Sequence, residues 1–216
     1  MKEISELTGP IAKLIAELEA NPMISTQVML DLLADASLTI NDVDPFSYFN
    51  HPEGESYGRL SVYQSKRLKV LVLSWNPGDF TAIHDHEPAE WGAVQFFGDI
   101  SHRLYSLENN RVVLQQAATI QHGQMVGVTG KLIHAMGNLS SQPAFTLHIY
   151  GTNTEFNTEF NTRVFDLELG KVVMTEGPAF LTRNPASFNV TSDGVTAKGE
   201  TWNDYVQNTT VWRSKQ

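Results

Sequence analysis

The sequence predicts a mainly β protein, either an antiparallel sandwich or a barrel, with a small helical segment at its N-terminus. Over residues 1–45, apolar residues recur every three or four positions, which is the period of one helix face. From Tyr57 onward, short runs rich in β-branched and aromatic residues alternate with turn signals. Many short strands at such spacing are typical of all-β sandwiches and barrels.

The helical segment contains two predicted helices. In the first, the apolar residues that share one face are Ile4, Leu7, Ile11, Leu14, Ile15 and Leu18. Asn21-Pro22 ends this helix, because a proline pushes the residue before it out of the helical conformation. Ser25 is a suitable N-cap for a second helix that carries Val28, Met29, Leu32 and Leu33. Asp44-Pro45 closes the region.

The strand region is divided by turn-forming residues. These signals are Pro77-Gly78, Gly98-Asp99, Asn109-Asn110, Gly123 and Ser140-Ser141. Between and beyond them, the predicted strands are Arg67–Trp75, Trp91–Phe97, His102–Ser106, Val112–Gln116, Met125–Val128, Leu132–Ala135, Phe145–Tyr150 and Arg163–Leu167. The short repeat Asn153–Phe156 and Asn157–Phe160 predicts a loop or turn before the last of these strands.

We divide the chain into three parts of one structural domain. Residues 1–50 form a helical N-terminal segment packed on the barrel, residues 51–180 the β domain, and residues 181–216 a C-terminal extension. Asn, Thr, Ser and Gly are frequent in the extension, which we expect to be a loosely packed tail along the surface. Trp202 and Trp212 are its candidate anchors.

Composition limits the partners that we expect. The net charge is −9, which does not favour binding to nucleic-acid phosphates. Apolar runs are too short for a membrane span, and residues 1–7 lack the apolar core of a signal peptide. No cysteine is present, which excludes disulfides and thiolate metal sites. We therefore expect a cytoplasmic protein, monomeric or homodimeric, that binds a small molecule and neither nucleic acid nor a membrane.

Three of the seven histidines form a candidate metal site. His84 and His86 stand one residue apart, and His134 follows in a later predicted strand. In a strand, residues i and i+2 point to the same face, so two imidazoles can grip one ion while a neighbouring strand supplies the third. Three imidazoles bind iron, nickel, manganese or zinc and leave positions open for a substrate. The contexts of His51, His102 and His122 indicate surface or loop positions.

The segments around these histidines, Gly78 to Glu90 and Gly130 to Asn138, resemble the two sequence motifs of the cupin superfamily. The resemblance implies that residues 51–180 fold as a cupin domain, a double-stranded β-helix or jelly-roll barrel. In other cupins a glutamate shortly after the His-x-His pair is a fourth ligand. Glu90 is therefore a candidate fourth ligand here.

Further motifs follow one another in a specific order. They are Tyr57-Gly58-Arg59, Trp75 to Gly78, Ile83-His84-Asp85-His86, His134 to Asn138, and Thr146-Leu147-His148-Ile149-Tyr150. Together, over residues 57–151, they resemble the cysteine dioxygenase family of thiol dioxygenases, which includes the 3-mercaptopropionate dioxygenases. The helical N-terminus is compatible with this family.

The resemblance implies a role for each matching residue. His84, His86 and His134 would bind Fe(II), the implied cofactor. Arg59 would hold the substrate carboxylate, a task suited to its planar, permanently charged fork. Thr146, His148 and Tyr150 would match the family's Ser-His-Tyr relay, with Tyr150 beside the reacting atoms. On one strand these three side chains share a face.

The sequence also departs from the family. Animal cysteine dioxygenases have a cysteine five residues after the second histidine, crosslinked to the active-site tyrosine. Here that position is Trp91, and no cysteine exists with which to form the crosslink. Bacterial thiol dioxygenases also lack the crosslink, so activity remains compatible with the sequence. We expect the bulky Trp91 to reshape the pocket, and Thr146 to keep the hydroxyl of the family's serine.

The function that the sequence favours is oxidation of a small thiol carboxylate by a mononuclear non-heme iron dioxygenase. Cysteine and 3-mercaptopropionate are both candidate substrates, O2 is the second substrate, and the product is a sulfinic acid. One alternative is a cupin whose metal is held by the three histidines and Glu90, serving another dioxygenase, an isomerase or a decarboxylase. The other is a non-catalytic small-molecule-binding cupin, although the sequence contains no helix-turn-helix segment and no basic patch.

Overall fold

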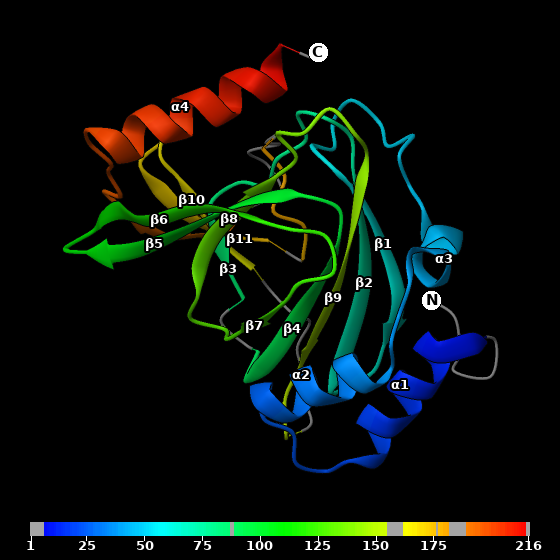
Figure 1. The fold of residues 1–216 in the computed structure, drawn as a ribbon. Coiled ribbons are helices and arrows are strands. Elements are labelled where there is room, and N and C mark those ends of the chain that lie inside the picture. The colour runs from blue at the N-terminus through cyan, green and yellow to red at the C-terminus, as the bar shows by residue number, and fades with distance from the viewer. Residues whose placement is uncertain (1–6, 87–88, 155–161, 176, 182–188, 215–216) are drawn as a thin grey trace.

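Two antiparallel sheets face one another in the structure, a computed structural model that describes residues 7–86, 89–154, 162–175, 177–181 and 189–214. Within these residues the smaller sheet has the strand order β1-β2-β9-β4-β7, and the larger sheet has the order β12-β11-β10-β3-β8-β5-β6. Helices α1 to α3 lie beside the smaller sheet, and α4 crosses the outside of the larger sheet (Figure 1). This is the mainly β, cupin-type double-stranded β-helix that the sequence predicts.

Most of the strands match the predicted ones to within a few residues. The smaller sheet contains β1 (Gly58–Gln64), β2 (Leu68–Trp75), β4 (Trp91–Phe97), β7 (Met125–Val128) and β9 (Ala144–Gly151). The larger sheet contains β3 (His84–Asp85), β5 (Ile100–Glu108), β6 (Arg111–Ile120), β8 (Ile133–Gly137), β10 (Thr162–Asp166), β11 (Lys171–Thr175) and β12 (Asn189–Asp193). Strands β1, β3, β11 and β12 were not predicted individually. The Asn-Thr-Glu-Phe repeat lies largely outside the described residues.

The N-terminal segment forms the two predicted helices and a short third one. They are α1 (Gly9–Ala20), α2 (Thr26–Asp35) and α3 (Ile40–Val43), followed by a 3-10 turn at Asp44–Phe46. Ser25 caps α2 as predicted, because its Oγ accepts a hydrogen bond from the backbone N–H of Val28 at 3.2 Å. The apolar faces of α1 and α2 pack against the smaller sheet in one hydrophobic core. Ile4, predicted on the first helix, lies outside the described residues.

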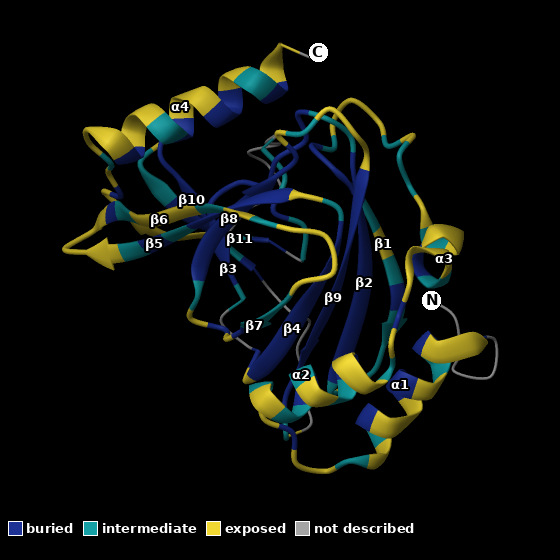
Figure 2. Cartoon of the chain, in the orientation of Figure 1, coloured by how far each residue is buried: buried dark blue, intermediate teal, exposed yellow. Residues whose placement is uncertain are grey.

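Strand β9 presents its side chains alternately to two different surroundings. The odd-numbered residues from Phe145 to Ile149 belong to the outer core shared with the N-terminal helices. The even-numbered residues Thr146, His148 and Tyr150 point into the space between the sheets. All eight residues of β9 are buried (Figure 2). The helices therefore allow β9 to carry polar residues on its inner face without exposing its outer face.

The C-terminal extension is not the loosely packed tail that its composition suggested. It adds β12 to the edge of the larger sheet and forms α4 (Glu200–Arg213). A partly buried ion pair holds α4 to β5, with 2.6 Å between Oδ1 of Asp204 and Nε of Arg103. Trp212 is buried on the same helix, whereas Trp202 is 37% exposed. Within the described residues, none of the helices is long and apolar enough to cross a membrane.

Candidate active site

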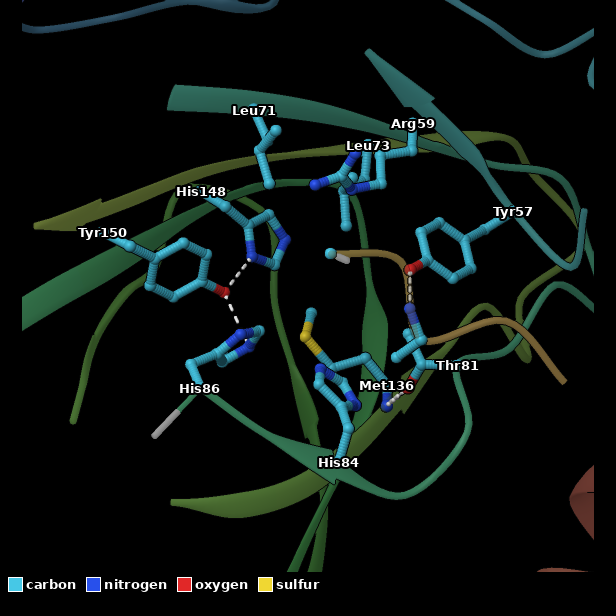
Figure 3. A pocket seen from close by; sticks show the side chains of 12 residues that line it. Tyr57, Arg59, Leu71, Leu73, Thr81, His84, His86, Met136, His148 and Tyr150 are labelled. Atoms are coloured by element: carbon cyan, nitrogen blue, oxygen red, sulfur yellow. Dashed lines mark hydrogen bonds between the residues drawn. The ribbon is translucent and has the colours of Figure 1, made fainter. Parts of the chain in front are cut away.

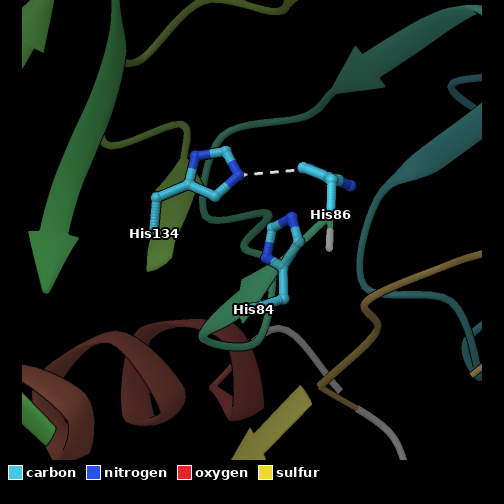
Figure 4. Close-up of side chains that lie close together, drawn as sticks. All are labelled: His84, His86 and His134. Atoms are coloured by element: carbon cyan, nitrogen blue, oxygen red, sulfur yellow. Dashed lines mark hydrogen bonds between the residues drawn. The ribbon is translucent and has the colours of Figure 1, made fainter. Parts of the chain in front are cut away.

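Three histidine side chains meet between the two sheets, as the sequence predicts. His84 of β3 pairs directly with His134 of β8, and His86 follows β3 (Figure 4). One ring nitrogen from each histidine lies within 4.8 Å of the other two. Nε2 of His86 and Nε2 of His134 are 3.3 Å apart. This is near the roughly 3 Å that separates neighbouring ligands of an octahedral ion with metal–nitrogen bonds of about 2.1 Å.

The rings of His84 and His134 are oriented by hydrogen bonds that their Nδ1 atoms form. Nδ1 of His84 donates to the carbonyl oxygen of Ala82 at 2.9 Å. Because a carbonyl oxygen can only accept, the ring proton is on Nδ1, and the lone pair of Nε2 is free for a metal. Nδ1 of His134 is likewise 2.9 Å from Nε2 of His102. His102 therefore orients the His134 ring.

The prediction that His102 is a surface or loop residue is wrong. It lies on β5, is 7% exposed, and faces β8 because these two strands pair along their length. His51 and His122 do lie outside the helices and strands, as predicted. His51 bonds to Oδ2 of Asp79 at 3.1 Å, away from the three-histidine group.

A line of hydrogen bonds runs along β9 to the histidine group. Oγ1 of Thr146 is 2.8 Å from Nε2 of His148, and Nδ1 of His148 is 2.8 Å from the hydroxyl of Tyr150. That hydroxyl is 3.1 Å from Nε2 of His86 (Figure 3). The structure thus brings Thr146, His148 and Tyr150 together on one face, as their spacing predicts.

Trp75, at the end of β2, determines which atoms in this line of hydrogen bonds donate and which accept. Its Nε1–H donates to Oγ1 of Thr146 at 2.9 Å, and an indole nitrogen can only donate. The acceptor that the described residues offer to the Thr146 hydroxyl is then Nε2 of His148. The imidazole proton consequently lies on Nδ1 and points to the oxygen of Tyr150. This leaves the hydrogen of Tyr150 free to point toward His86.

His84 and His86 of the histidine group line a pocket. Arg59 of β1 lies on the opposite side from His84, with its guanidinium pointing inward (Figure 3). Tyr57 stands beside Arg59, and its hydroxyl accepts a hydrogen bond from the backbone N–H of Ala179 at 3.0 Å. The segment that carries Gly177 and Ala179 thereby closes one side of the pocket.

Burial keeps the histidines of the site neutral. It lowers the pKa of His84 to about 4 and that of His148 to about 3. It also lowers the pKa of His86 and His134 well below 6.5, and the neighbouring histidines add to the effect. Burial raises the pKa of Tyr150 above 10.0. At neutral pH the imidazoles are therefore ready to bind a metal, and the Tyr150 hydroxyl keeps its proton.

The donor set fits a transition metal with open coordination positions. Three neutral imidazoles form the group, and the structure does not bring Glu90 into it. The Glu90 side chain is exposed, and its Oε2 accepts a hydrogen bond from the backbone N–H of Asn153 at 2.8 Å. A site of three histidines leaves more positions for substrate than one with an additional glutamate ligand would.

Comparison with known proteins agrees with this geometry. Residues 6–163 match the family model described as cysteine dioxygenase type I. The chain belongs to the cysteine dioxygenase family. It is 23% identical over 179 residues to cysteine dioxygenase type 1 of Rattus norvegicus, a match that covers 74% of this chain and 87% of the relative. The Homo sapiens enzyme matches with the same identity and coverage.

Among solved structures, a cupin-superfamily sugar phosphate isomerase from Silicibacter pomeroyi is similar in part. The two chains are 14% identical, with a TM-score of 0.43, and the match covers 68% of this chain and 82% of that one.

As a member of the cysteine dioxygenase family, the chain differs at the position of the crosslinked cysteine. The prediction that Trp91 reshapes the pocket is wrong, because its side chain belongs to the outer core and does not line the pocket. The residue of β4 directly opposite Tyr150 is Gly92. A Cβ at Gly92 would lie 2.9 Å from Cδ1 of Tyr150. The tyrosine therefore packs against bare backbone.

Several residues around this cysteine dioxygenase-like site were not selected from the sequence. Tyr57 and Trp75 stand in motifs that were recognised, and a period of two links Tyr57 to Arg59. That period could have marked Tyr57 as a pocket residue. Lys69 and His102 gave no such signal, because only the pairing of their strands with neighbouring strands brings them to the site.

Proposed function

We propose that the protein is a mononuclear iron thiol dioxygenase. It would convert a small thiol carboxylate, of the cysteine or 3-mercaptopropionate class, and O2 into the sulfinic acid. The proposal rests on one observation: Arg59 and Tyr150 line the same pocket as His84 and His86, two members of the three-histidine group. The reaction R–SH + O2 → R–SO2H places both oxygen atoms on sulfur and needs no further reductant.

The thiol end and the carboxylate end of such a substrate would bind at different places in the pocket. An iron ion held by His84, His86 and His134 would supply the open positions and the redox chemistry through which a thiol and O2 react. Arg59 binds the carboxylate at the other end, where its planar fork can form two parallel hydrogen bonds. This arrangement fixes the sulfur end of the molecule toward the histidines.

Tyr150 provides a hydrogen-bond donor next to the reacting atoms. Its hydroxyl lies 3.1 Å from Nε2 of His86. Once the lone pair of that nitrogen is used for metal binding, the hydroxyl needs another acceptor, and it faces the pocket. Nδ1–H of His148 holds the phenol oxygen in place at 2.8 Å. A simple tyrosine, fixed by its relay, thus takes the place of the crosslinked tyrosine of animal relatives.

The two alternative functions would each require different features of the site. A cupin with three histidines and one glutamate as ligands, whether another dioxygenase, an isomerase or a decarboxylase, would need a carboxylate beside the histidines, and Glu90 is hydrogen-bonded elsewhere. A non-catalytic binding cupin would need only the pocket, and it would not consume O2.

Oxygen consumption tests the proposal. Ferrous-loaded protein should consume one O2 per sulfinate formed from a small thiol carboxylate, and His86→Ala should lose both the metal and this activity. Full iron occupancy without thiol-dependent oxygen uptake, for every small thiol tried, would favour the non-catalytic cupin.

The role of Arg59 is tested in the same assay. Arg59→Ala should lower kcat/KM for carboxylated thiols by about ten- to a hundredfold, the value of a charge-assisted pair. Cysteamine, which has no carboxylate, should be affected much less. Equal losses for both kinds of thiol would show that Arg59 does not recognise the carboxylate, and a melting curve of the variant reports any damage to the fold.

A further inference from the structure

Two apolar walls face one another across the pocket beside the histidines. Leu71 and Leu73 of β2 pair directly with residues of β9 that face the space between the sheets, so the two leucines leave the smaller sheet on the same face. Met136 of β8 stands two residues after His134 and points inward from the larger sheet on the same face as this histidine. All three apolar side chains line the pocket. Figure 3 shows Met136 on one side of the pocket and the two leucines on the other.

Backbone hydrogen bonds and packing hold Met136 in this place. Its N–H donates to Oγ1 of Thr81 at 2.9 Å, and its carbonyl oxygen accepts from the N–H of Thr81 at 2.8 Å. The Met136 side chain is 1% exposed and belongs to the same apolar cluster as Leu71 and Leu73. Because a close-packed wall of this kind yields little, the size of the Met136 side chain determines the width of the gap between the two walls.

The gap lies between the two places where the ends of a substrate would bind. His84 and His86 line the pocket at one end, and Arg59 lies on the opposite side from His84 (Figure 3). A molecule with its thiol at the histidines and its carboxylate at Arg59 would therefore pass its carbon chain between Met136 and the leucines.

We propose that Met136 determines which carbon skeletons the pocket accepts, and that it excludes a chain with a methyl branch between the thiol and the carboxylate. This inference rests on the proposed thiol dioxygenase function and adds a size limit to it. Cysteine and 3-mercaptopropionate both have an unbranched three-carbon skeleton. The unbranched, adaptable methionine side chain can pack closely against such a chain. An added methyl group would need space that the two walls already fill, and overpacking of this kind is unfavourable.

The kinetic test compares 3-mercaptopropionate with 3-mercapto-2,2-dimethylpropionate in the iron-loaded protein. Both molecules carry the same thiol and the same carboxylate, and the second places a methyl group on each side of the chain. The kcat/KM for the dimethyl thiol should be lower by about tenfold or more. Met136→Ala should reduce this discrimination by about tenfold, because it removes one wall. Met136→Leu has a similar volume and should keep the discrimination.

Two further variants control for effects on the fold. Met136→Ala leaves a cavity in the core, so a melting curve reports any damage to the fold. Met136→Val leaves a smaller cavity and should show an intermediate discrimination. Met23→Ala, at a position that is 69% exposed, should leave the ratio of the two kcat/KM values unchanged.

Two results would overturn the inference. One is a wild-type protein that uses both thiols equally well. The other is a folded Met136→Ala variant that discriminates as strongly as the wild type, which would mean that the carbon chain does not pass Met136. In both cases thiol oxidation by the wild type would leave the proposed dioxygenase function standing.

A binding measurement without O2 separates the two proposals. In oxygen-free buffer, 3-mercaptopropionate should raise the melting temperature of the iron-loaded wild type more than the dimethyl thiol does, and Met136→Ala should remove most of this difference. If the two thiols bind in this way but neither is oxidised in air, the size limit stands and the dioxygenase function fails. Equal shifts for both thiols in the wild type would refute the size limit, whatever the protein oxidises.

Discussion

The position of the Tyr150 hydroxyl depends on a chain of hydrogen-bonded side chains behind it. Trp75 donates to Thr146, and this leaves the threonine hydroxyl to donate to His148. His148 then donates to the phenol oxygen at 2.8 Å. A buried chain of donors of this kind gives each proton one location, because every unpaired polar group would carry a desolvation cost.

Replacing the tyrosine should separate metal binding from turnover. Tyr150→Phe should keep the fold and the iron but lower kcat, or uncouple oxygen uptake from sulfinate formation, because the pocket loses its hydroxyl donor. His148→Asn should act in the same direction, and the double variant should be clearly less impaired than the sum of the two losses. Oxygen uptake and sulfinate, measured together, check this. Unchanged turnover and coupling in Tyr150→Phe would remove the tyrosine from the mechanism.

His102 should affect the metal rather than the substrate. His102→Phe removes the acceptor of the His134 Nδ1–H, 2.9 Å away, and should weaken metal binding by about ten- to a hundredfold. His102→Gln keeps an acceptor and should recover part of the affinity. Competition with a chelator measures the dissociation constants, and His122→Phe, at an exposed position, is the control. Equal affinities in all variants would show that His102 does not orient the ring.

The sequence predicted those site residues whose geometry is local. His148 and Tyr150 share a face because they are two apart on β9, and His86 follows His84 by two residues at the end of β3, with their ring centres 4.8 Å apart. Lys69 could not be found in this way, since β2 is buried on both faces and its side chains show no clear alternation of polar and apolar residues.

At the scale of elements, regular strands were predictable and short or context-dependent elements were not. Trp91–Phe97 has the predicted bounds because its composition alone favours a strand. The helix Glu200–Arg213 is rich in Asn, Thr, Val and aromatic residues, which have modest helix propensity. Contacts with the barrel stabilise it instead: Tyr205 is buried in the core and Asp204 bonds to β5. A sequence pattern does not contain these contacts.

The docking of α4 should therefore depend on one partly buried carboxylate, that of Asp204. Asp204→Ala removes the partner of Arg103, which is 6% exposed, and leaves its charge uncompensated. We expect a loss of about 3–5 kcal/mol in the free energy of unfolding, measured with urea. Asp193→Ala breaks an exposed pair with Lys171 and should cost less than about 1 kcal/mol. Similar small losses for both variants would mean that α4 is held by its apolar contacts alone.

For the molecule as a whole, the buried imidazoles link the stability of the fold to pH. An unfolded histidine has a pKa of about 6.5, whereas burial lowers the pKa of His84 to about 4 and that of His148 to about 3. Between these values the unfolded chain binds protons that the folded chain does not bind. The stability of the metal-free protein is thus fully present above about pH 6.5 and is lost as the pH falls toward about 4.

Melting of the metal-free protein should show this dependence in a narrow window. At pH 5.5, one unit below the unfolded value, each such histidine should reduce the free energy of unfolding by about 1.4 kcal/mol. Most aspartates and glutamates ordinarily titrate below about pH 5, so a fall in Tm between pH 6.5 and 5 reports the histidines. His148→Gln removes one of them without removing a metal ligand, and its Tm should fall less steeply over the same interval. A wild-type Tm that stays constant down to pH 5 would mean that these rings accept protons as readily in the folded protein as in the unfolded chain, and that the site is not closed to water.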